Sequence, residues 1–161
     1  MIHLIVGNTG AGKTTYSQNI KAQTNGIIFS IDTWNNTLFM PDKTENDGLE
    51  WFLERIERSE SLIQKLCIQL NESGVDTILD LGLSKFDHRE KFRKFALENK
   101  IPILLHFLDI PKNIRRERIL KRNLEQGSTF EFEVSEANFE FMESWFEKPL
   151  DSELENAKIT I

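Results

Sequence analysis

The residues with the clearest chemical meaning lie near the start of the chain. Positions 7–14 read GNTGAGKT, which matches the phosphate-binding pattern G-x-x-x-x-G-K-[ST]. The pattern follows an apolar run at positions 2–6 and precedes a segment that is competent to form a helix. Backbone N–H groups at a helix N-terminus carry partial positive charge, and glycines let a phosphate group approach them closely. The sequence therefore predicts a binding site for a nucleoside triphosphate.

Each residue type in this loop has an expected task. Gly7 and Gly12 permit backbone angles that are closed to other residues, and Gly10 and Ala11 keep the lining of the loop small. Lys13 would reach the β and γ phosphates, and Thr14 would place its hydroxyl on a Mg²⁺ ion that bridges them. Nucleotide contacts are therefore expected from Gly7, Asn8, Thr9, Gly10, Ala11, Gly12, Lys13, Thr14 and Thr15.

Two aspartates lie where predicted strands end, and ligands of open α/β sheets bind at the carboxyl ends of the strands. Asp32 would orient an attacking hydroxyl group and accept its proton; the alternative is that it caps a turn before Trp34. Asp80 has the apolar-then-acidic context of a carboxylate that holds Mg²⁺, with a purely structural role as the alternative. Asp109 is expected to be the N-cap of a helix and to have no chemical role.

Three arginines form the next candidate group. At about 100° per residue, Arg115, Arg118 and Arg122 fall on one face of a helix, within roughly 60° of one another. Guanidinium groups that close over a transferring phosphoryl group neutralise its charge. The alternative is a charged helix face exposed to solvent. Because the stripe leads into a polar segment, we expect positions 115–134 to form a lid with a mobile loop.

These residues need a framework, and the chain alternates short apolar runs with amphipathic stretches. This alternation predicts a parallel sheet covered by helices. A helical period of apolar residues over 49–70 predicts one long helix, and Ser135 is expected to cap a helix over 136–146, with Val134 and Phe139 as a hydrophobic staple. The 161 residues suit a single domain, positions 1–161. Strands are expected at 2–6, 27–31, 77–81, 103–108 and 158–161.

Composition argues against several other classes of protein. A formal net charge of −6 does not suit a broad surface for extended nucleic acid. The single cysteine, Cys67, excludes an internal disulfide and favours the reducing cytoplasm. We find no charged leader and no apolar run of 18 residues, so neither a signal peptide nor a membrane span is expected. The three histidines do not have the spacing of metal ligands.

Together, the motifs resemble the P-loop kinases of the chloramphenicol phosphotransferase, polynucleotide kinase and zeta-toxin branch. The resemblance spans nearly the whole chain, and its carboxyl-terminal part also looks like that of bacterial ATP-binding proteins of the AAA type. It implies a P-loop NTPase fold, a three-layer α/β/α sandwich with a five-stranded parallel sheet in the order 2-3-1-4-5 and a small helical lid. It also implies that Asp32 is the general base and that Arg118 and Arg122 act from the lid. The resemblance rests on positions 7–14, 30–32, 78–82 with Arg89 downstream, and 108–111 with the three arginines that follow.

Departures from this group narrow the expected substrate. Polynucleotide kinases carry an arginine three residues after the base, whereas this chain has Asn35, and the run 30–34 is closer to the chloramphenicol phosphotransferase arrangement. A small hydroxyl compound is therefore favoured. The nearest match to a guanine-binding motif, at 99–102, lacks the required aspartate, which favours ATP over GTP. Five apolar residues are expected either to line a substrate pocket beside Asp32 or to belong to the core: Trp34, Leu38, Phe39, Trp51 and Phe52.

Three hypotheses of function follow. The first is a kinase that transfers the γ-phosphoryl group of MgATP to a hydroxyl group of a small molecule. The second is a nucleotide-dependent switch or regulatory ATPase that acts through a protein partner. The third is a kinase of polynucleotide 5′-hydroxyl groups or of nucleotide sugars. In the first hypothesis, the substrate loop is expected at about 32–48. The expected catalytic residues are Lys13, Asp32, Arg118 and Arg122. Thr14 and Asp80 would hold Mg²⁺, and Arg115 would be a weaker nucleotide contact.

Overall fold

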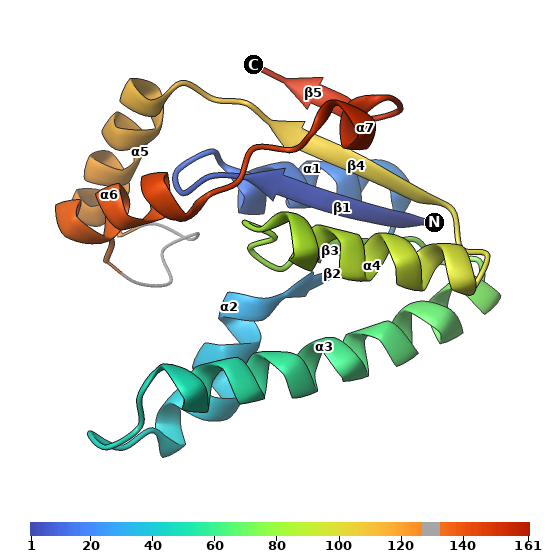
Figure 1. Cartoon of the computed structure of the whole chain (residues 1–161), viewed down its shortest axis with the longest axis horizontal. Helices are drawn as coiled ribbons and strands as arrows, with labels where there is room; N and C mark the ends of the chain where they lie inside the picture. The colour runs from blue at the N-terminus through green and yellow to red at the C-terminus, as the bar shows by residue number, and fades with distance from the viewer. Residues whose placement is uncertain (127–132) are drawn as a thin grey trace.

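The computed structural model describes residues 1–126 and 133–161 of the chain. Within them, five strands form one sheet, in which each strand runs parallel to its neighbours in the order β2-β3-β1-β4-β5 (Figure 1). The order and the parallel pairing confirm the prediction, and each predicted strand lies within one residue of its observed bounds. The strands are β1 Ile2–Gly7, β2 Ile27–Ser30, β3 Thr77–Asp80, β4 Ile103–Leu108 and β5 Lys158–Thr160.

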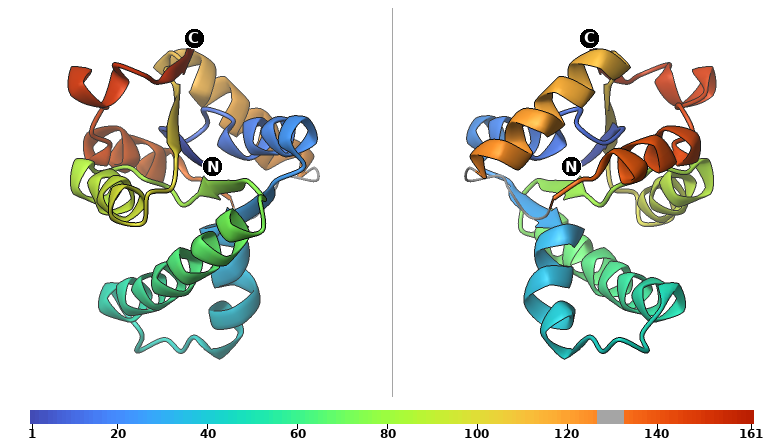
Figure 2. Two further views of the ribbon diagram at one scale, coloured as in Figure 1. Left: turned by 90° about the vertical axis from the view of Figure 1, so that its right-hand side faces the viewer. Right: turned by 90° about the vertical axis from the view of Figure 1, so that its left-hand side faces the viewer.

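Helices cover both faces of the sheet (Figures 1 and 2). Leu4 and Ile5 point to opposite faces because side chains alternate along a strand. Ile5 packs in a buried cluster with Ile20 of α1, whereas Leu4 belongs to a larger cluster with Ile63 of α3 and Phe92 of α4. The expected α/β/α sandwich is confirmed. The helices are α1 Lys13–Thr24, α2 Ile31–Trp34, α3 Leu49–Glu72, α4 Phe86–Glu98, α5 Lys112–Glu125, α6 Glu136–Trp145 and α7 Asp151–Leu154.

The segment expected as a substrate loop, positions 32–48, is largely helical. It contains most of α2, a π-helical stretch, η1 (Asn35–Phe39), and a 3₁₀ turn, η2 (Met40–Asp42). This segment and the first turns of α3 extend away from the sheet (Figures 1 and 2). The single long helix predicted from the apolar period is confirmed as α3. Within the described residues, every helix is too short or too polar to cross a bilayer.

Helix α6 begins where the sequence predicts. The backbone N–H of Asn138 donates a hydrogen bond to Ser135 Oγ over 3.2 Å, so Ser135 is the N-cap. Val134 and Phe139 lie in one buried cluster with Ile119 of α5, which confirms the hydrophobic staple. The cluster packs α5 and α6 against each other, and this pair stands beside the amino-terminal loop of the chain (Figure 1).

Helix α5 begins differently from the prediction. Pro111 occupies the N-cap position, and the carboxylate of Asp109, expected to be the cap, instead accepts a hydrogen bond from Lys148 Nζ over 2.6 Å. Proline fits this position because its ring fixes φ and the first helical N–H groups have no partner within the helix. Of the predicted lid and mobile loop over 115–134, positions 127–132 lie outside the described residues.

Candidate nucleotide-binding and phosphotransfer site

The loop between β1 and α1 has the geometry of a phosphate cradle. Gly10 and Gly12 have φ angles of 81° and 91°, in the left-handed region that favours glycine. The prediction of such angles is confirmed for Gly12 and wrong for Gly7, whose place Gly10 takes. Gly12 is the N-cap of α1. Because glycine has no side chain, no side-chain hydrogen bond caps this helix, and its first N–H groups remain directed at the loop. Lys13 Nζ donates a hydrogen bond across the loop to the carbonyl oxygen of Gly7 over 3.0 Å. The loop thus presents backbone donors and one ammonium group at a helix N-terminus.

The charge of Lys13 is poorly solvated in the structure. Desolvation lowers the pKa of its ammonium group, and the carboxylates of Asp80 and Asp32 act in the opposite direction, whereas the arginines nearby reinforce the lowering. A bound phosphate would bring further negative charge next to this group and favour its protonated form. The loop therefore suits an anion electrostatically as well as sterically.

Thr14 and Asp80 bring two kinds of oxygen ligand together. Thr14 Oγ1 donates a hydrogen bond to Asp80 Oδ2 over 3.1 Å, between the first turn of α1 and the carboxyl end of β3. Burial raises the pKa of the Asp80 carboxyl group, while Lys13 and the hydrogen bond from Thr14 lower it. A hydroxyl and a buried carboxylate next to a phosphate loop are the donor set that Mg²⁺ takes in nucleotide sites. The residues present therefore fit this ion.

Asp32 lies in the first turn of α2 and not at its cap. The N-cap is Ser30, whose Oγ accepts a hydrogen bond from the backbone N–H of Thr33 over 3.4 Å. The side chain of Asp32 lines the same cavity as Lys13 and Asp80, and this cavity has a volume of about 270 Å³. The N-cap of α2 is therefore Ser30, and the role of Asp32 stays a prediction.

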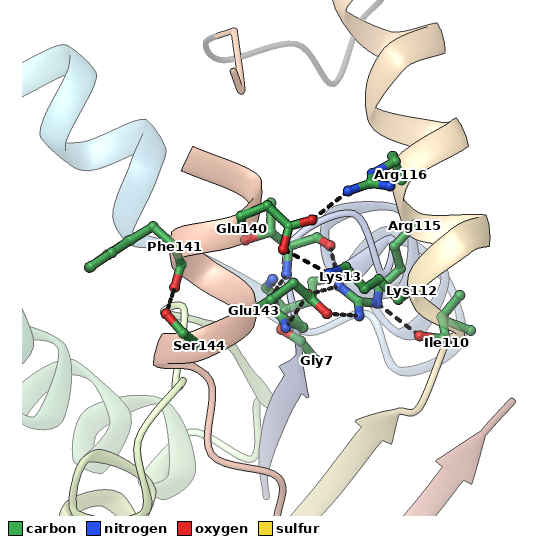
Figure 3. Close-up of polar contacts among 12 residues, drawn as sticks. Gly7, Lys13, Ile110, Lys112, Arg115, Arg116, Glu140, Phe141, Glu143 and Ser144 are labelled. Atoms are coloured by element: carbon green, nitrogen blue, oxygen red, sulfur yellow. Dashed lines mark hydrogen bonds and ion pairs between the residues drawn. The ribbon is translucent and has the colours of Figure 1, made fainter. Parts of the chain in front are cut away.

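The arginine stripe of α5 divides between two environments. Arg118 and Arg122 line the cavity, and Arg118 Nη1 donates a hydrogen bond to the carbonyl oxygen of Ala11 over 3.2 Å. Burial lowers the pKa of Arg122, and the charge of Asp32 opposes this shift. Arg115 is buried and turned away, with its guanidinium group paired to Glu143 of α6 (Figure 3). Two of the three arginines are thus placed to meet a ligand, and the third joins two helices.

A second cavity of about 420 Å³ adjoins the first, and both are lined by Gly12, Thr15 and Arg118. Of its other walls, sequence reasoning identified Ala11 alone, because the rest come together only through the sheet, in which β4 pairs with β5. They include aliphatic side chains and a tyrosine, which suit one face of a planar base. The remaining lining residues are Ala11, Tyr16, Asn19, Leu108, Ile110, Thr160 and Ile161.

The apolar residues expected to line a substrate pocket do not line the first cavity. Trp34 packs edge-on against Phe29 with ring centroids 5.8 Å apart, and it borders the main core. Trp51 and Phe52 contact each other in the same manner, and Leu38 is largely exposed. The apolar lining of the cavity comes from Ile119 and Val134, which the sequence analysis did not propose.

The geometry defines a nucleotide-binding α/β protein with a P-loop, and comparisons with known proteins agree. The AAA_33 family model, described as an AAA domain, matches residues 2–149, so the chain belongs to this family. This places it in the branch of P-loop kinases that its motifs resemble. A search of curated protein sequences gives no significant match.

Solved structures share the fold at low sequence identity. Kti12 of Chaetomium thermophilum, in complex with ADP-AlF3, has a TM-score of 0.72 at 15% identity, covering 99% of this chain and 88% of that one. A sugar kinase of a Janibacter species has 0.62 at 18%, covering 99% and 83%. The APS kinase CysC of Mycobacterium tuberculosis, in complex with AMPPNP and APS, has 0.62 at 16%, covering 92% and 82%. Two of these proteins hold nucleotides or analogues, which supports nucleotide binding by this fold.

Proposed function

We propose that this protein is an ATP-dependent kinase that transfers the γ-phosphoryl group of MgATP to a hydroxyl group of a small molecule. One observation carries the proposal: a second carboxylate, Asp32, lines the cavity that also holds Lys13 and Asp80. Nucleotide binding requires the P-loop and the magnesium ligands, but it does not require Asp32. A further carboxylate at the phosphate end of the site is what activation of an acceptor needs.

The donor nucleotide would span both cavities. The P-loop amides and Lys13 would hold the phosphates in the first, and the second, which shares Gly12 and Arg118 with it as lining residues, would receive the base. ATP is preferred over GTP because the chain lacks a guanine-binding motif with its aspartate. Thr14 and Asp80 would hold Mg²⁺, which, when bound, neutralises the charge of the β and γ phosphates.

The chain's own groups account for the transfer step. Asp32 orients the acceptor hydroxyl group and takes its proton as the oxygen attacks the γ phosphorus in line. A new O–P bond forms while the bond from the γ phosphorus to the β-phosphate oxygen breaks, and ADP leaves. Arg118 and Arg122 would donate hydrogen bonds to the transferring oxygens. With a volume of about 270 Å³, part of it needed for phosphates, the first cavity suits a small acceptor.

Transfer of labelled γ-phosphate from MgATP tests the proposal. The acceptor panel contains small alcohols and sugars, nucleosides, nucleotide sugars and 5′-hydroxyl oligonucleotides. Asp32→Asn is expected to lose transfer by about 10²-fold or more while still binding ATP, because it removes a general base and not a phosphate contact. Asp87→Asn, an exposed substitution in the first turn of α4, is the matched control and is expected to keep full activity. Lys13→Ala is expected to abolish nucleotide binding.

A second candidate function is a nucleotide-dependent switch that acts on a protein partner. Its supporting observation is the set of exposed apolar side chains on the segment that extends from the sheet, with Leu38, Leu49 and Leu53 each more than half exposed. A switch needs Lys13 and Thr14 and tolerates Asp32→Asn. If native protein and Asp32→Asn hydrolyse ATP equally, and no acceptor in the panel is labelled, the kinase proposal is wrong and the switch is favoured.

A further inference from the structure

One carboxylate outside the cavity contacts both the P-loop and α5, the helix of the predicted lid, which we call the lid helix. Glu143, near the end of α6, accepts a hydrogen bond from Asn8 Nδ2 at its Oε1 over 2.6 Å. It also accepts two hydrogen bonds from the guanidinium group of Arg115, one of them from Nη2 to Oε2 over 2.9 Å. Figure 3 shows Glu143 and Arg115 facing each other beside Gly7 and Lys13.

On the P-loop side, the bond to Glu143 orients a side chain that shapes the loop. Asn8 is 8% exposed, and its Oδ1 accepts the backbone N–H of Thr9 over 2.7 Å. Its amide group therefore has fixed donor and acceptor ends: the nitrogen points to Glu143 and the oxygen to the loop. Asn8 therefore links Glu143 to the backbone at Thr9.

On the lid side, Arg115 connects the same carboxylate to the backbone of the loop. Its Nη1 donates to the carbonyl oxygen of Thr9 over 3.1 Å, and its Nε donates to that of Ile110 over 2.8 Å. Arg118, one helical turn further along α5, donates to the carbonyl oxygen of Ala11. The position of α5, and with it the position of a cavity arginine, is therefore tied to the loop through Arg115.

We propose that Glu143 is a positioning residue: it holds Asn8 of the P-loop and Arg115 of the lid helix in one network and so sets the geometry in which the phosphates meet Arg118. The assignment rests on the proposed nucleotide site, because that site is what the network would position. Its predicted consequence is that removing the charge of Glu143 weakens nucleotide binding and loosens the loop, although Glu143 does not line either cavity beside the loop.

Helix α6 offers a matched control in Glu140. This residue lies one turn earlier and also pairs with α5, through Lys112 and Arg116, but these groups are partly exposed and neither of the two partners belongs to the P-loop. Glu140→Gln and Glu143→Gln make the same chemical change on the same helix. A merely structural contribution to the α5–α6 contact is common to both, whereas an effect on the loop is expected from Glu143→Gln alone.

The experiment measures two quantities in the native chain and in the variants Glu143→Gln, Glu140→Gln, Asn8→Ala and the double variant Asn8→Ala with Glu143→Gln. The first is the exchange rate of the Thr9 backbone amide in the nucleotide-free protein, which needs no ligand. The second is the affinity for AMPPNP with Mg²⁺. Glu143→Gln is expected to accelerate exchange and to weaken binding by about tenfold, a size typical of coupled neighbours, and Glu140→Gln is expected to change neither.

The double variant tests the route of the effect. If Glu143 acts through Asn8, the double variant loses less affinity than the product of the two single losses. Additive losses, or equal effects of Glu140→Gln and Glu143→Gln on Thr9 exchange, would overturn the assignment. Should Glu143→Gln fail to fold, Glu143→Asp replaces it, because the shorter side chain draws the carboxylate away from Asn8 and Arg115. Unchanged Thr9 exchange and unchanged affinity in that variant would overturn the assignment. If the native chain binds no nucleotide, the proposed function fails, and the exchange data still decide the role of Glu143.

Discussion

A single methyl group at Gly10 is expected to disturb both stability and function. Gly10 has a φ angle of +81°, and a Cβ atom there would lie 2.6 Å from the backbone oxygen of Arg115 and 3.0 Å from Ile119 Cδ1. The first distance is shorter than real Cβ contacts allow, and the obstacle is helix backbone, which cannot rotate away. Gly10→Ala therefore combines backbone strain with an overlap between the P-loop and α5.

A substitution at Gly74 serves as a control that has the backbone strain without the overlap. It has a φ angle of +72°, close to that of Gly10, but a Cβ atom there would meet no atom within 4 Å in the part of the chain that the structure describes. Gly74→Ala is expected to cost about 1–2 kcal/mol from strain alone, equivalent to about 2–8 °C in Tm for a domain of this size. Gly10→Ala adds the cost of overpacking, about 1–3 kcal/mol, for a total of about 2–5 kcal/mol.

The overlap also has a functional consequence. To reach ordinary van der Waals contact, the P-loop and the Arg115 backbone must separate by about 0.8 Å. Since a misplacement of about 1 Å can cost about 10²-fold in rate, Gly10→Ala is expected to lower turnover by about 10-fold to 100-fold, and Gly74→Ala is expected to leave it unchanged. Urea unfolding and ATP turnover measure the two effects. Equal stability of the two variants, together with native turnover in Gly10→Ala, would refute the close approach described here.

Two further predictions concern buried polar groups. Arg89→Met is expected to destabilise the fold by about 3–5 kcal/mol in urea unfolding, because it leaves the buried carboxylate of Glu153 without its partner; a loss under about 1 kcal/mol would contradict this. Burial lowers the pKa of His106 to about 4, with smaller contributions from His3 and Lys158. The unfolded chain therefore binds more protons between about pH 6.5 and 4, and the free energy of unfolding is expected to fall as pH falls through this window, with a weaker dependence in His106→Asn.

Local features of the fold could be predicted because they depend on neighbours in the chain. The strands and α3 follow from apolar periodicity, and the N-cap at Ser135 follows from a short pattern of residue types. The P-loop is equally local, since its glycines, Lys13 and Thr14 must be consecutive to wrap a phosphate group. The strand order, by contrast, came from the resemblance to a known branch of kinases and was confirmed by the structure.

Other predictions depended on which partner a side chain contacts in the folded protein, and the sequence does not show this. The residue type and position of Asp109 suit an N-cap. In the structure, however, Pro111 is the N-cap, and the carboxylate of Asp109 accepts a hydrogen bond from Lys148. Arg115 shares a helix face with Arg118, but the carboxylate of Glu143, 28 positions away, turns it from the cavity. Helical spacing predicts only the face of the helix on which a side chain lies. The orientation of the Arg115 side chain on that face is set by its buried ion pair.

By itself, the sequence determined that this protein has a phosphate loop, a parallel α/β framework and two aspartates at strand ends, because these features are written in consecutive residues and in periodicity. Only the tertiary structure decided that Asp32 and Asp80 line one cavity, which arginines reach it, and that Glu143 joins α5 to the loop. These contacts join residues separated by up to 135 positions, and no local pattern encodes them. They arise only when the folded sheet brings the loop after β1 and the end of β3 together with α2, α5 and α6.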